Sequence, residues 1–123
     1  MKFMVLLAYV EGRWETATPE ERQEVMDLHT AFHKAVAERA TMLAGEALAE
    51  SSAARTLRYV DGEPVVTEGP YAEGVEHLGG FYLIEAESME LMLELCRGLP
   101  ASYSVEVRPV VEIEGYEDTR DWE

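Results

Sequence analysis

The sequence predicts an α+β fold in the ferredoxin-like split βαβ arrangement, an antiparallel sheet with two helices on one face. Three observations favour this fold. The apolar segments follow the order strand, helix, strand, hairpin, strand, helix, strand. Each helical segment carries a single apolar stripe, as helices that cover one face of a sheet do. The first strand is apolar on both faces, so the sheet needs a second cover as well.

The chain has 123 residues, the usual size of one domain. We expect a single domain over residues 1–113 and an acidic tail over 114–123, in which only Trp122 has the character of a docking side chain. No apolar run approaches the roughly 20 residues needed to cross a bilayer. The start at Met1 lacks the cleavage pattern of a secretory signal. We therefore expect a soluble, cytoplasmic protein.

Charge is the largest departure from average composition, since 25 acidic and 10 basic residues give a formal net charge of −15. Nucleic acids are bound by Lys and Arg that neutralise phosphates, and the sequence has no basic cluster. The composition therefore argues against nucleic acid and against anionic membranes as partners. The one cysteine, Cys96, excludes an intrachain disulfide and falls on an apolar helical stripe, where we expect a small core residue.

The first strand is expected from Lys2 to Val10. Successive side chains of a strand point to opposite faces, which places Phe3, Val5, Leu7 and Tyr9 on one face and Met4, Leu6, Ala8 and Val10 on the other. Helices cover one of these faces. A second copy of the chain is the simplest cover for the other. The pattern therefore predicts a homodimer that packs sheet against sheet.

The first helix is expected to begin after Thr18, because Thr is a good N-cap, Pro19 suits the first helical position and acidic residues follow. It should end near Arg39. Its buried face should consist of Val25, Leu28, Phe32, Ala35 and Val36. His29 borders this apolar stripe, and His33 follows one turn later, turned further toward water.

The remaining segments are assigned from turn residues and periodicity. We expect a loop over 12–18, a strand over 41–48, a loop over 50–54, a hairpin of strands 55–60 and 63–67 around Asp61-Gly62, a buried strand over 81–85 and a last strand over 103–113. The second helix should start at Ser88 and bury Met89, Met92, Leu93, Cys96 and Leu99. Pro64 cannot donate to a ladder, so the second hairpin strand is short or lies at an edge.

Five segments then point to a family: MKFMVLL at 1–7, LAGEAL at 43–48, EGPYAE at 68–73, LGGFYLI at 78–84 and SVEVRP at 104–109. Together they resemble the YCII-related proteins, and specifically the subgroup named for an Asp-Gly-Pro-Phe motif. The resemblance implies a dimeric α+β barrel with a pocket between sheet and helices in each subunit. It implies no single reaction, although a characterised relative removes chloride from a hydroxylated aromatic ring.

This sequence departs from the family pattern in two places. Glu68-Gly69-Pro70-Tyr71 stands for Asp-Gly-Pro-Phe, which keeps an acid and an aromatic ring. Gly74 to His77 stands where Thr-Lys-Glu-Gln is expected, so Val75 replaces the usual Lys and a histidine appears two positions later. If that Lys holds an anionic substrate in relatives, the substrate class of this chain is open.

Three residues are candidates for acid–base catalysis. His29 borders the helix face where the resemblance puts the pocket, and His77 directly precedes the Leu78-Gly79-Gly80 segment. Imidazole exchanges protons near neutral pH, which suits either residue for that role. Glu68 precedes a turn, where an acid acts as a base or hydrogen-bonds the amides of its own turn. Each histidine also has a purely structural interpretation, as a boundary residue with satisfied hydrogen bonds.

The candidates for ligand binding are Tyr71, Glu73, Gly79, Gly80, Tyr82, Glu46 and Arg108. The two tyrosines supply ring area to a pocket wall. The double glycine either lets a ligand or a partner's backbone approach the sheet or forms a bulge, and the two are compatible. We expect no metal and no cofactor, although His29 and His33 stand four residues apart on one helix, as paired metal ligands would.

Three functions remain open at this point. The first is a small cofactor-independent lyase or isomerase that acts on a small, partly apolar substrate, with a histidine moving the proton. The second is a non-catalytic protein that binds a small molecule or serves as an accessory. The third is a structural dimer module.

Overall fold

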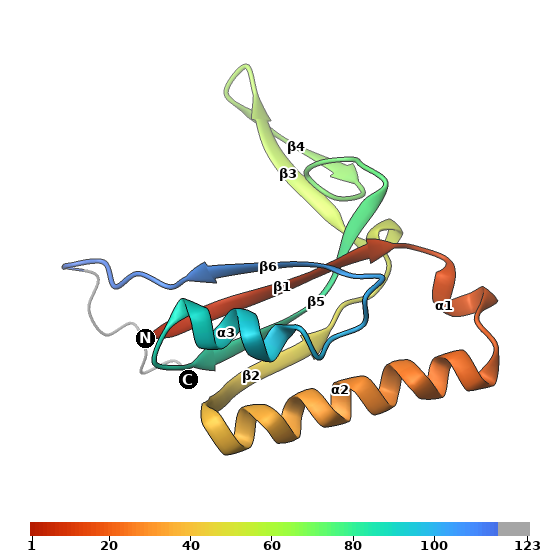
Figure 1. Cartoon of the computed structure of the whole chain (residues 1–123). Helices are drawn as coiled ribbons and strands as arrows, with labels where there is room; N and C mark the ends of the chain where they lie inside the picture. The colour runs from red at the N-terminus through yellow and green to blue at the C-terminus, as the bar shows by residue number, and fades with distance from the viewer. Residues whose placement is uncertain (116–123) are drawn as a thin grey trace.

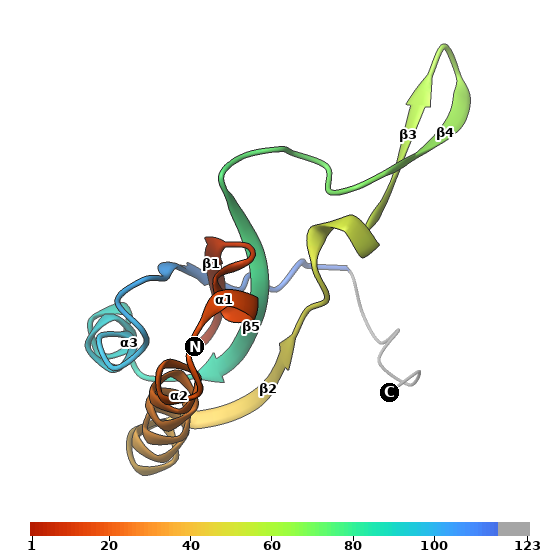
Figure 2. The same ribbon diagram turned by 90° about the vertical axis from the view of Figure 1, so that its right-hand side faces the viewer.

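The computed structural model describes residues 1–115 (Figure 1). Its body is a four-stranded antiparallel sheet in the order β2-β5-β1-β6, formed by β1 (Lys2–Val10), β2 (Thr41–Ala47), β5 (Glu76–Glu85) and β6 (Ser104–Pro109). Two helices, α2 (Pro19–Arg39) and α3 (Met89–Cys96), lie on the same side of this sheet (Figure 2). The predicted α+β fold class is therefore confirmed.

The start of α2 follows from its first four residues. The Thr18 side chain accepts a hydrogen bond from the Glu21 amide at 3.1 Å, and the Glu21 carboxylate accepts one from the Thr18 amide at 2.8 Å. This capping box satisfies amides that a helix leaves free at its N-terminus. The helix ends at Arg39, as predicted. Its buried face centres on Phe32 and Val36.

The core fills the space between the sheet and the two helices. In β1 the fully buried residues alternate with partly exposed ones, so one face of the strand is covered and the other is not. The largest fully buried side chains are Phe3, Phe32, Ile84, Met92, Val5 and Val36. Cys96 is partly buried against this core, and its burial raises the pKa of the thiol to about 11. The expectation that it is a small core residue is confirmed.

Two predicted loops contain short helices. The segment 12–18 includes α1 (Arg13–Thr16), and 50–54 includes the 3-10 helix η1 (Ser51–Ala53). Arg22 of α2 donates to the Trp14 carbonyl at 2.9 Å, and its guanidinium lies 5.3 Å from the centre of the Trp14 ring. A single turn held by such a tertiary contact is too short to show periodicity in the sequence.

Three other boundaries or faces differ from the predictions. In α3 the buried stripe contains Leu95, which is 5% exposed, and not Leu93, which is 51% exposed. The strand β5 begins at Glu76, five residues earlier than expected, because β1 is long enough to pair with it there. The strand β6 ends at Pro109 and not at residue 113. The Val110 amide donates to the carbonyl of Lys2, where β1 begins, so later residues find no partner in that strand.

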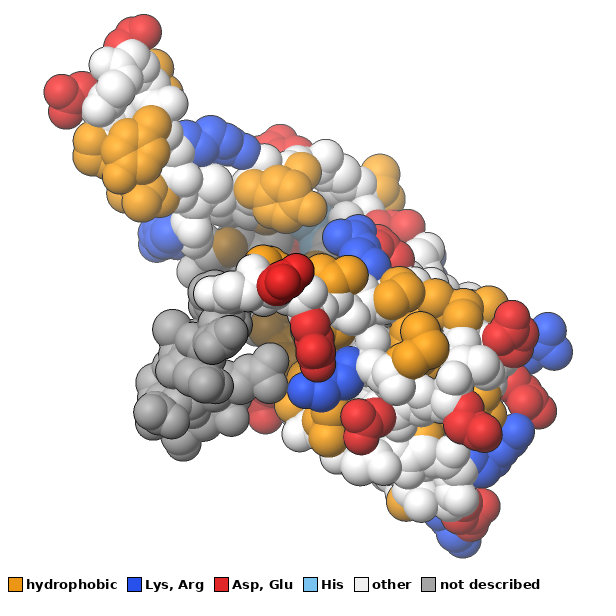
Figure 3. All heavy atoms as spheres, turned by 90° about the vertical axis from the view of Figure 1, so that its left-hand side faces the viewer, with side chains coloured by type: hydrophobic (Ala, Val, Ile, Leu, Met, Phe, Trp, Pro, Cys, Tyr) orange, Lys and Arg blue, Asp and Glu red, His pale blue; other side chains and the backbone are white. Residues whose placement is uncertain are grey.

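The strands β3 (Arg55–Val60) and β4 (Glu63–Glu68) form a separate two-stranded hairpin, as predicted. It projects away from the helices (Figure 2). Hydrophobic side chains gather toward its far end (Figure 3). Within the hairpin, Leu57, Tyr59 and Val66 are each more than half exposed. An isolated hairpin is marginally stable in water.

Residues 116–123, which include Trp122 and most of the predicted acidic tail, lie outside the described residues. The domain boundary at residue 113 stays a prediction. Within residues 1–115, none of the helices has the length and apolar character needed to cross a membrane.

Candidate functional site

Two histidines of α2 face the sheet. His29 and His33 are four residues apart, so they lie on the same side of the helix, one turn from each other. His29 is partly buried, whereas His33 is exposed. Both reach the hydroxyl of Tyr82. His33 is the more exposed of the two, as predicted, and its Nε2 still reaches the buried hydroxyl of Tyr82.

Tyr82 stands on the covered face of β5, where it is 7% exposed. Its partner across the sheet is Gly45 of β2. A Cβ atom at Gly45 would fall 2.5 Å from Cδ1 of the Tyr82 ring, which is closer than real contacts allow. Gly45 is therefore the residue that leaves room for the ring, and the ring then extends its hydroxyl to α2.

Four side chains form one continuous series of hydrogen bonds. The Tyr82 hydroxyl lies 2.7 Å from His29 Nδ1 and 2.8 Å from His33 Nε2. The second nitrogen of His29, Nε2, lies 2.9 Å from the hydroxyl of Tyr103. Both nitrogens of a half-buried imidazole are thus held by phenolic hydroxyls.

Aromatic rings surround this series. The ring of Tyr103, which directly precedes β6, lies 5.2 Å from the ring of Tyr9 in β1. The ring of Phe32 lies 5.0 Å from that of Tyr82. Such spacings are typical of favourable aromatic pairs. We use the name tyrosine–histidine cluster for Tyr9, His29, His33, Tyr82 and Tyr103.

The double glycine supports one end of the cluster. The β1–β5 register shifts between Leu7 and Ala8, which leaves Gly79 as the extra residue of a β-bulge. The predicted bulge is thus confirmed. A Cβ at Gly79 would lie 2.2 Å from the Tyr9 hydroxyl, so the group that approaches this glycine is a tyrosine of the same chain. Gly80 lies against β2, where a Cβ would come 3.0 Å from the Glu46 carbonyl oxygen.

Burial sets the protonation states in the cluster. It lowers the pKa of His29, and the charge of His33 lowers it further. Burial also raises the pKa of Tyr82, and it raises that of Tyr103 to about 12 with smaller contributions from Tyr9 and Tyr82. The pKa of Tyr9 is raised by burial and by nearby carboxylates. Near neutral pH the cluster therefore holds a neutral His29 imidazole among protonated hydroxyls.

Two predicted site residues lie on the opposite face of the sheet. Glu46 pairs with Phe81 across β2 and β5, and Arg108 pairs with Met4 across β6 and β1. These positions alternate with the covered ones, so their side chains point away from the helices. Arg108 Nε donates to Glu106 at 2.7 Å. The structure does not bring Glu46 or Arg108 to His29.

Three more predicted residues lie at the base of the projecting hairpin. Glu68 ends β4, and its side chain is 85% exposed, with Oε1 3.9 Å from Arg55. Tyr71 is 81% exposed, and its carbonyl accepts a hydrogen bond from Arg58. Glu73 is exposed as well. Within the described chain, none of the three side chains is hydrogen-bonded to the tyrosine–histidine cluster.

His77 lies near the end of the sheet that carries the bulge. It pairs with Tyr9 in the β1–β5 ladder and is partly buried. Its charge contributes to the lowered pKa of Glu11, after two larger contributions from hydrogen bonds that Ser51 donates to this carboxylate at 2.6 and 2.9 Å. His77 therefore lies beside Glu11, apart from the hydrogen bonds of His29.

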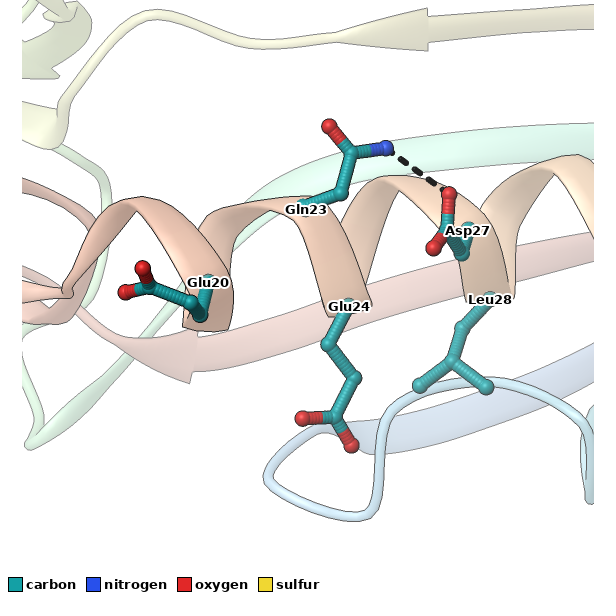
Figure 4. Close-up of a pocket in the computed structure, with 5 residues that line it drawn as sticks. All are labelled: Glu20, Gln23, Glu24, Asp27 and Leu28. Carbon is teal, nitrogen blue, oxygen red and sulfur yellow. Dashed lines mark hydrogen bonds between the residues drawn. The ribbon is translucent and has the colours of Figure 1, made fainter.

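A surface depression on α2 includes no member of the tyrosine–histidine cluster. Among residues 1–115, no three His, Cys, Asp or Glu side chains are close enough to hold a metal ion. A depression of about 390 Å³ lies on the surface of α2 and is lined by Glu20, Gln23, Glu24, Asp27 and Leu28 (Figure 4). Gln23 donates to Asp27, one turn further along the helix, at 2.8 Å. None of the predicted site residues lines this acidic surface.

His33, Tyr103 and Tyr9 were not among the predicted site residues. The four-residue spacing of His29 and His33 was the available signal for His33, because one face of a helix holds both. Tyr103 precedes a strand and is 74 residues from His29. Spacing along the chain gave no signal that could have connected these two residues.

Comparison with known proteins agrees with the architecture. Residues 1–114 match the family described as the YCII-related domain. The chain is also similar to the uncharacterized protein R00369 of Rhizobium meliloti (strain 1021), with 35% identity over 114 residues that cover 89% of this chain and 92% of the relative. Since the match spans nearly the whole chain, the protein belongs to the YCII-related family.

Proposed function

We propose that this protein is a small cofactor-independent enzyme of lyase or isomerase type, in which His29 moves a proton on a small, partly apolar substrate. The observation that carries the proposal is the hydrogen-bonding of His29. Its two ring nitrogens contact the hydroxyls of Tyr82 and Tyr103 at 2.7 and 2.9 Å inside a largely aromatic cluster. A neutral imidazole with a fixed ring orientation is suited to act as a general base.

The two nitrogens have different roles in this proposal. Tyr82 is buried and held between Gly45 and α2, so its contact with Nδ1 fixes the imidazole. Tyr103 lies in the connection between α3 and β6 and is less buried. A substrate would take the place of the Tyr103 hydroxyl at Nε2, which then removes or returns its proton. The rings of Tyr9 and Phe32 favour a substrate with apolar surface.

A second candidate is a non-catalytic protein that binds a small molecule at the same cluster. The observation that favours it is that both nitrogens of His29 are already satisfied within the chain. A histidine of this kind also serves as a structural core residue or as a recognition group. Binding and catalysis therefore need separate experiments.

A thermal-shift screen of small metabolites tests both functions, since a ligand that binds the native state raises the melting temperature. The screen compares the wild type with His29→Gln, and His77→Gln is the matched control outside the hydrogen-bonded cluster. We expect a ligand that stabilises the wild type and His77→Gln but stabilises His29→Gln less. A ligand that acts equally on all three proteins would place the site elsewhere and overturn the proposal.

Proton exchange then separates an enzyme from a binding protein. Each stabilising ligand is incubated with the protein in D2O and followed by NMR. An enzyme that moves a proton incorporates deuterium into the ligand or converts it, and His29→Gln slows this at least about 100-fold, the usual size of general-base catalysis. Binding without exchange or conversion would favour the second candidate.

We further propose a homodimer in which the uncovered sheet faces pack against each other, the arrangement of a dimeric α+β barrel. The partly exposed apolar residues Met4, Leu6, Phe81 and Leu83 support this proposal, because they lie on the face without helices. Membership of the Asp-Gly-Pro-Phe subgroup and a cytoplasmic location stay predictions from the sequence.

A further inference from the structure

The tyrosine–histidine cluster connects the protein surface with its interior. One end of the hydrogen-bonded series is His33, which is exposed on α2. The other end is Tyr103, which is partly buried and packs on Tyr9. Tyr82 and His29 lie between these two ends. The three donor–acceptor distances that connect the four side chains are 2.7 to 2.9 Å. Each separation is that of a normal hydrogen bond.

The donors and acceptors of this series fit two arrangements. A neutral imidazole has one donor and one acceptor nitrogen, and a phenolic hydroxyl donates once and also accepts. In the first arrangement His33 Nε2 donates to Tyr82, Tyr82 donates to His29 Nδ1, and His29 Nε2 donates to Tyr103. In the second arrangement every donor is reversed, so Tyr103 donates to His29, His29 to Tyr82, and Tyr82 to His33.

One proton that crosses the cluster converts the first arrangement into the second. A proton binds His33 Nδ1 from solvent, and His33 Nε2 gives its own proton to Tyr82. Tyr82 gives its proton to His29 Nδ1, and His29 Nε2 gives its proton to Tyr103. Tyr103 is only partly buried, and its original proton passes to solvent. Each O–H or N–H bond that breaks is replaced, and the four groups end as neutral as they began.

We propose that His33 and Tyr82 relay protons between solvent and the His29 site, with His33 as the surface end. This relay rests on the proposed function of His29 as the proton-moving group. His33 is in this view a positioning residue that restores the protonation of His29 between turnovers.

The groups that face His29 favour a proton relay and do not favour a fixed ion pair with this imidazole. They are His33 from the same helix, Tyr82 from β5 and Tyr103 from the segment before β6. Within residues 1–115, no carboxylate is hydrogen-bonded to His29. A carboxylate would hold the proton on the imidazole. Burial instead lowers the pKa of His29, so the ring releases a proton readily.

The relay is tested without a ligand by NMR of protein labelled with 15N in its histidine rings. A His33 ring that has taken up a second proton has two donor nitrogens, so Tyr82 must then donate to His29 Nδ1. We expect the spectra to show neutral His29 with its ring proton on Nε2 whenever His33 carries that second proton. Tyr82→Phe removes the link and should abolish this response, whereas Tyr103→Phe leaves the link in place and should preserve it.

The outcomes separate the relay from the proposed function. If the position of the His29 ring proton does not depend on the protonation of His33 in the wild type, or depends on it equally in Tyr82→Phe, the relay is wrong, even where a ligand binds at His29. Another outcome is that the NMR response depends on Tyr82 while His29→Gln weakens the binding of no ligand in the thermal-shift screen. In that case the hydrogen-bonded connection is supported and the proposed function is contradicted. Circular dichroism of each variant shows whether the fold is retained.

Discussion

The two faces of β1 are almost equally apolar in sequence but differ in what covers them. On one face Phe3 and Val5 are fully buried, and Leu7 is 5% exposed, beneath the helices. On the other face Met4, Leu6 and Ala8 remain partly exposed in the isolated chain. The side chains on one face of β1 therefore belong to the core, whereas those on the other face form an uncovered apolar surface.

The difference teaches where chemistry is to be expected. On the covered face, α2 brings His29 and His33 above Tyr82, and glycines leave room for tyrosine rings. The uncovered face carries charged residues such as Glu46 and Arg108 on its outer strands β2 and β6. A polar cluster that is partly withdrawn from water has the stronger potential for acid–base chemistry, whereas an apolar centre with charged edges suits association.

The largest expected effect comes from truncating a phenylalanine on the covered face. Phe3→Ala removes a fully buried ring and should lower the free energy of unfolding by about 3–5 kcal/mol. The matched variant on the other face is Phe81→Ala, whose cost should grow with protein concentration because a second copy would cover Phe81 only in the proposed dimer. Urea denaturation at two protein concentrations measures both. Phe81→Ala could lower the free energy of unfolding as much as Phe3→Ala does, and equally at both protein concentrations. That result would contradict the distinction between the two faces.

The next effect concerns the uncovered face alone. Leu6→Glu places a charge in the centre of the proposed dimer interface, and an uncompensated buried charge costs several kcal/mol, so dimer affinity should fall by at least about 100-fold. Sedimentation velocity should then report the mass of one chain. Leu57→Glu on the projecting hairpin is the control, and we expect it to remain dimeric. A wild type that sediments as a monomer would contradict the dimer directly.

A smaller effect is expected where a glycine accommodates the cluster. Gly45→Ala puts a Cβ within 2.5 Å of the Tyr82 ring, close to its attachment to the backbone, so the ring must shift. Overpacking of this kind costs about 1–3 kcal/mol, and the shift should also weaken the contacts of Tyr82 with both histidines. The measurement is thermal unfolding together with histidine NMR. Gly74→Ala is the control, since its nearest neighbour would be 3.8 Å away, and a loss of similar size there would contradict the packing argument.

Much of the fold was predictable because its signals are local. Thr18 and Pro19 mark the start of α2, and the alternation from Lys2 to Val10 marks β1. The segments that were missed depend on distant partners. The turn α1 is held by Arg22, and the last strand ends where β1 has no further residues to pair with. Sequence periodicity carries no record of such contacts.

The site was predictable only in part, because its members come from four distant segments. His29 and Tyr82 were both candidates, and the structure brings them within 2.7 Å. Tyr103 was not a candidate, since a tyrosine before a strand has no distinguishing pattern. The segment 68–73 carries the family motif, which was the stronger signal for a site. Its residues Glu68 and Tyr71 are nevertheless exposed and lie apart from His29 in this chain. A family motif identifies the fold more directly than it identifies the reacting group.

The smallest expected effect is the contribution of His29 to the pH dependence of the free energy of unfolding. Its pKa in the folded protein is lowered, mainly by burial, below the ordinary value of about 6.5. As the pH falls through 6.5, the unfolded chain binds this proton before the folded one does. His29 therefore contributes stability above about pH 6.5 and loses that contribution as the pH falls toward its folded pKa. The loss should stay below about 1 kcal/mol, because the half-exposed ring is screened by solvent.

The difference between the wild type and His29→Gln isolates this contribution, because Gln keeps a donor and an acceptor but does not titrate. Urea denaturation between pH 7 and about pH 5 is the suitable range. The carboxylates with shifted pKa values, lowered in Glu11, Glu21 and Glu94 and raised in Glu50, are present in both proteins and cancel in the difference. The stability of the wild type should fall more steeply over this range than that of His29→Gln. Parallel curves would show that the pKa of His29 is the same in the folded and the unfolded protein, and the effect of burial on this imidazole would then be contradicted.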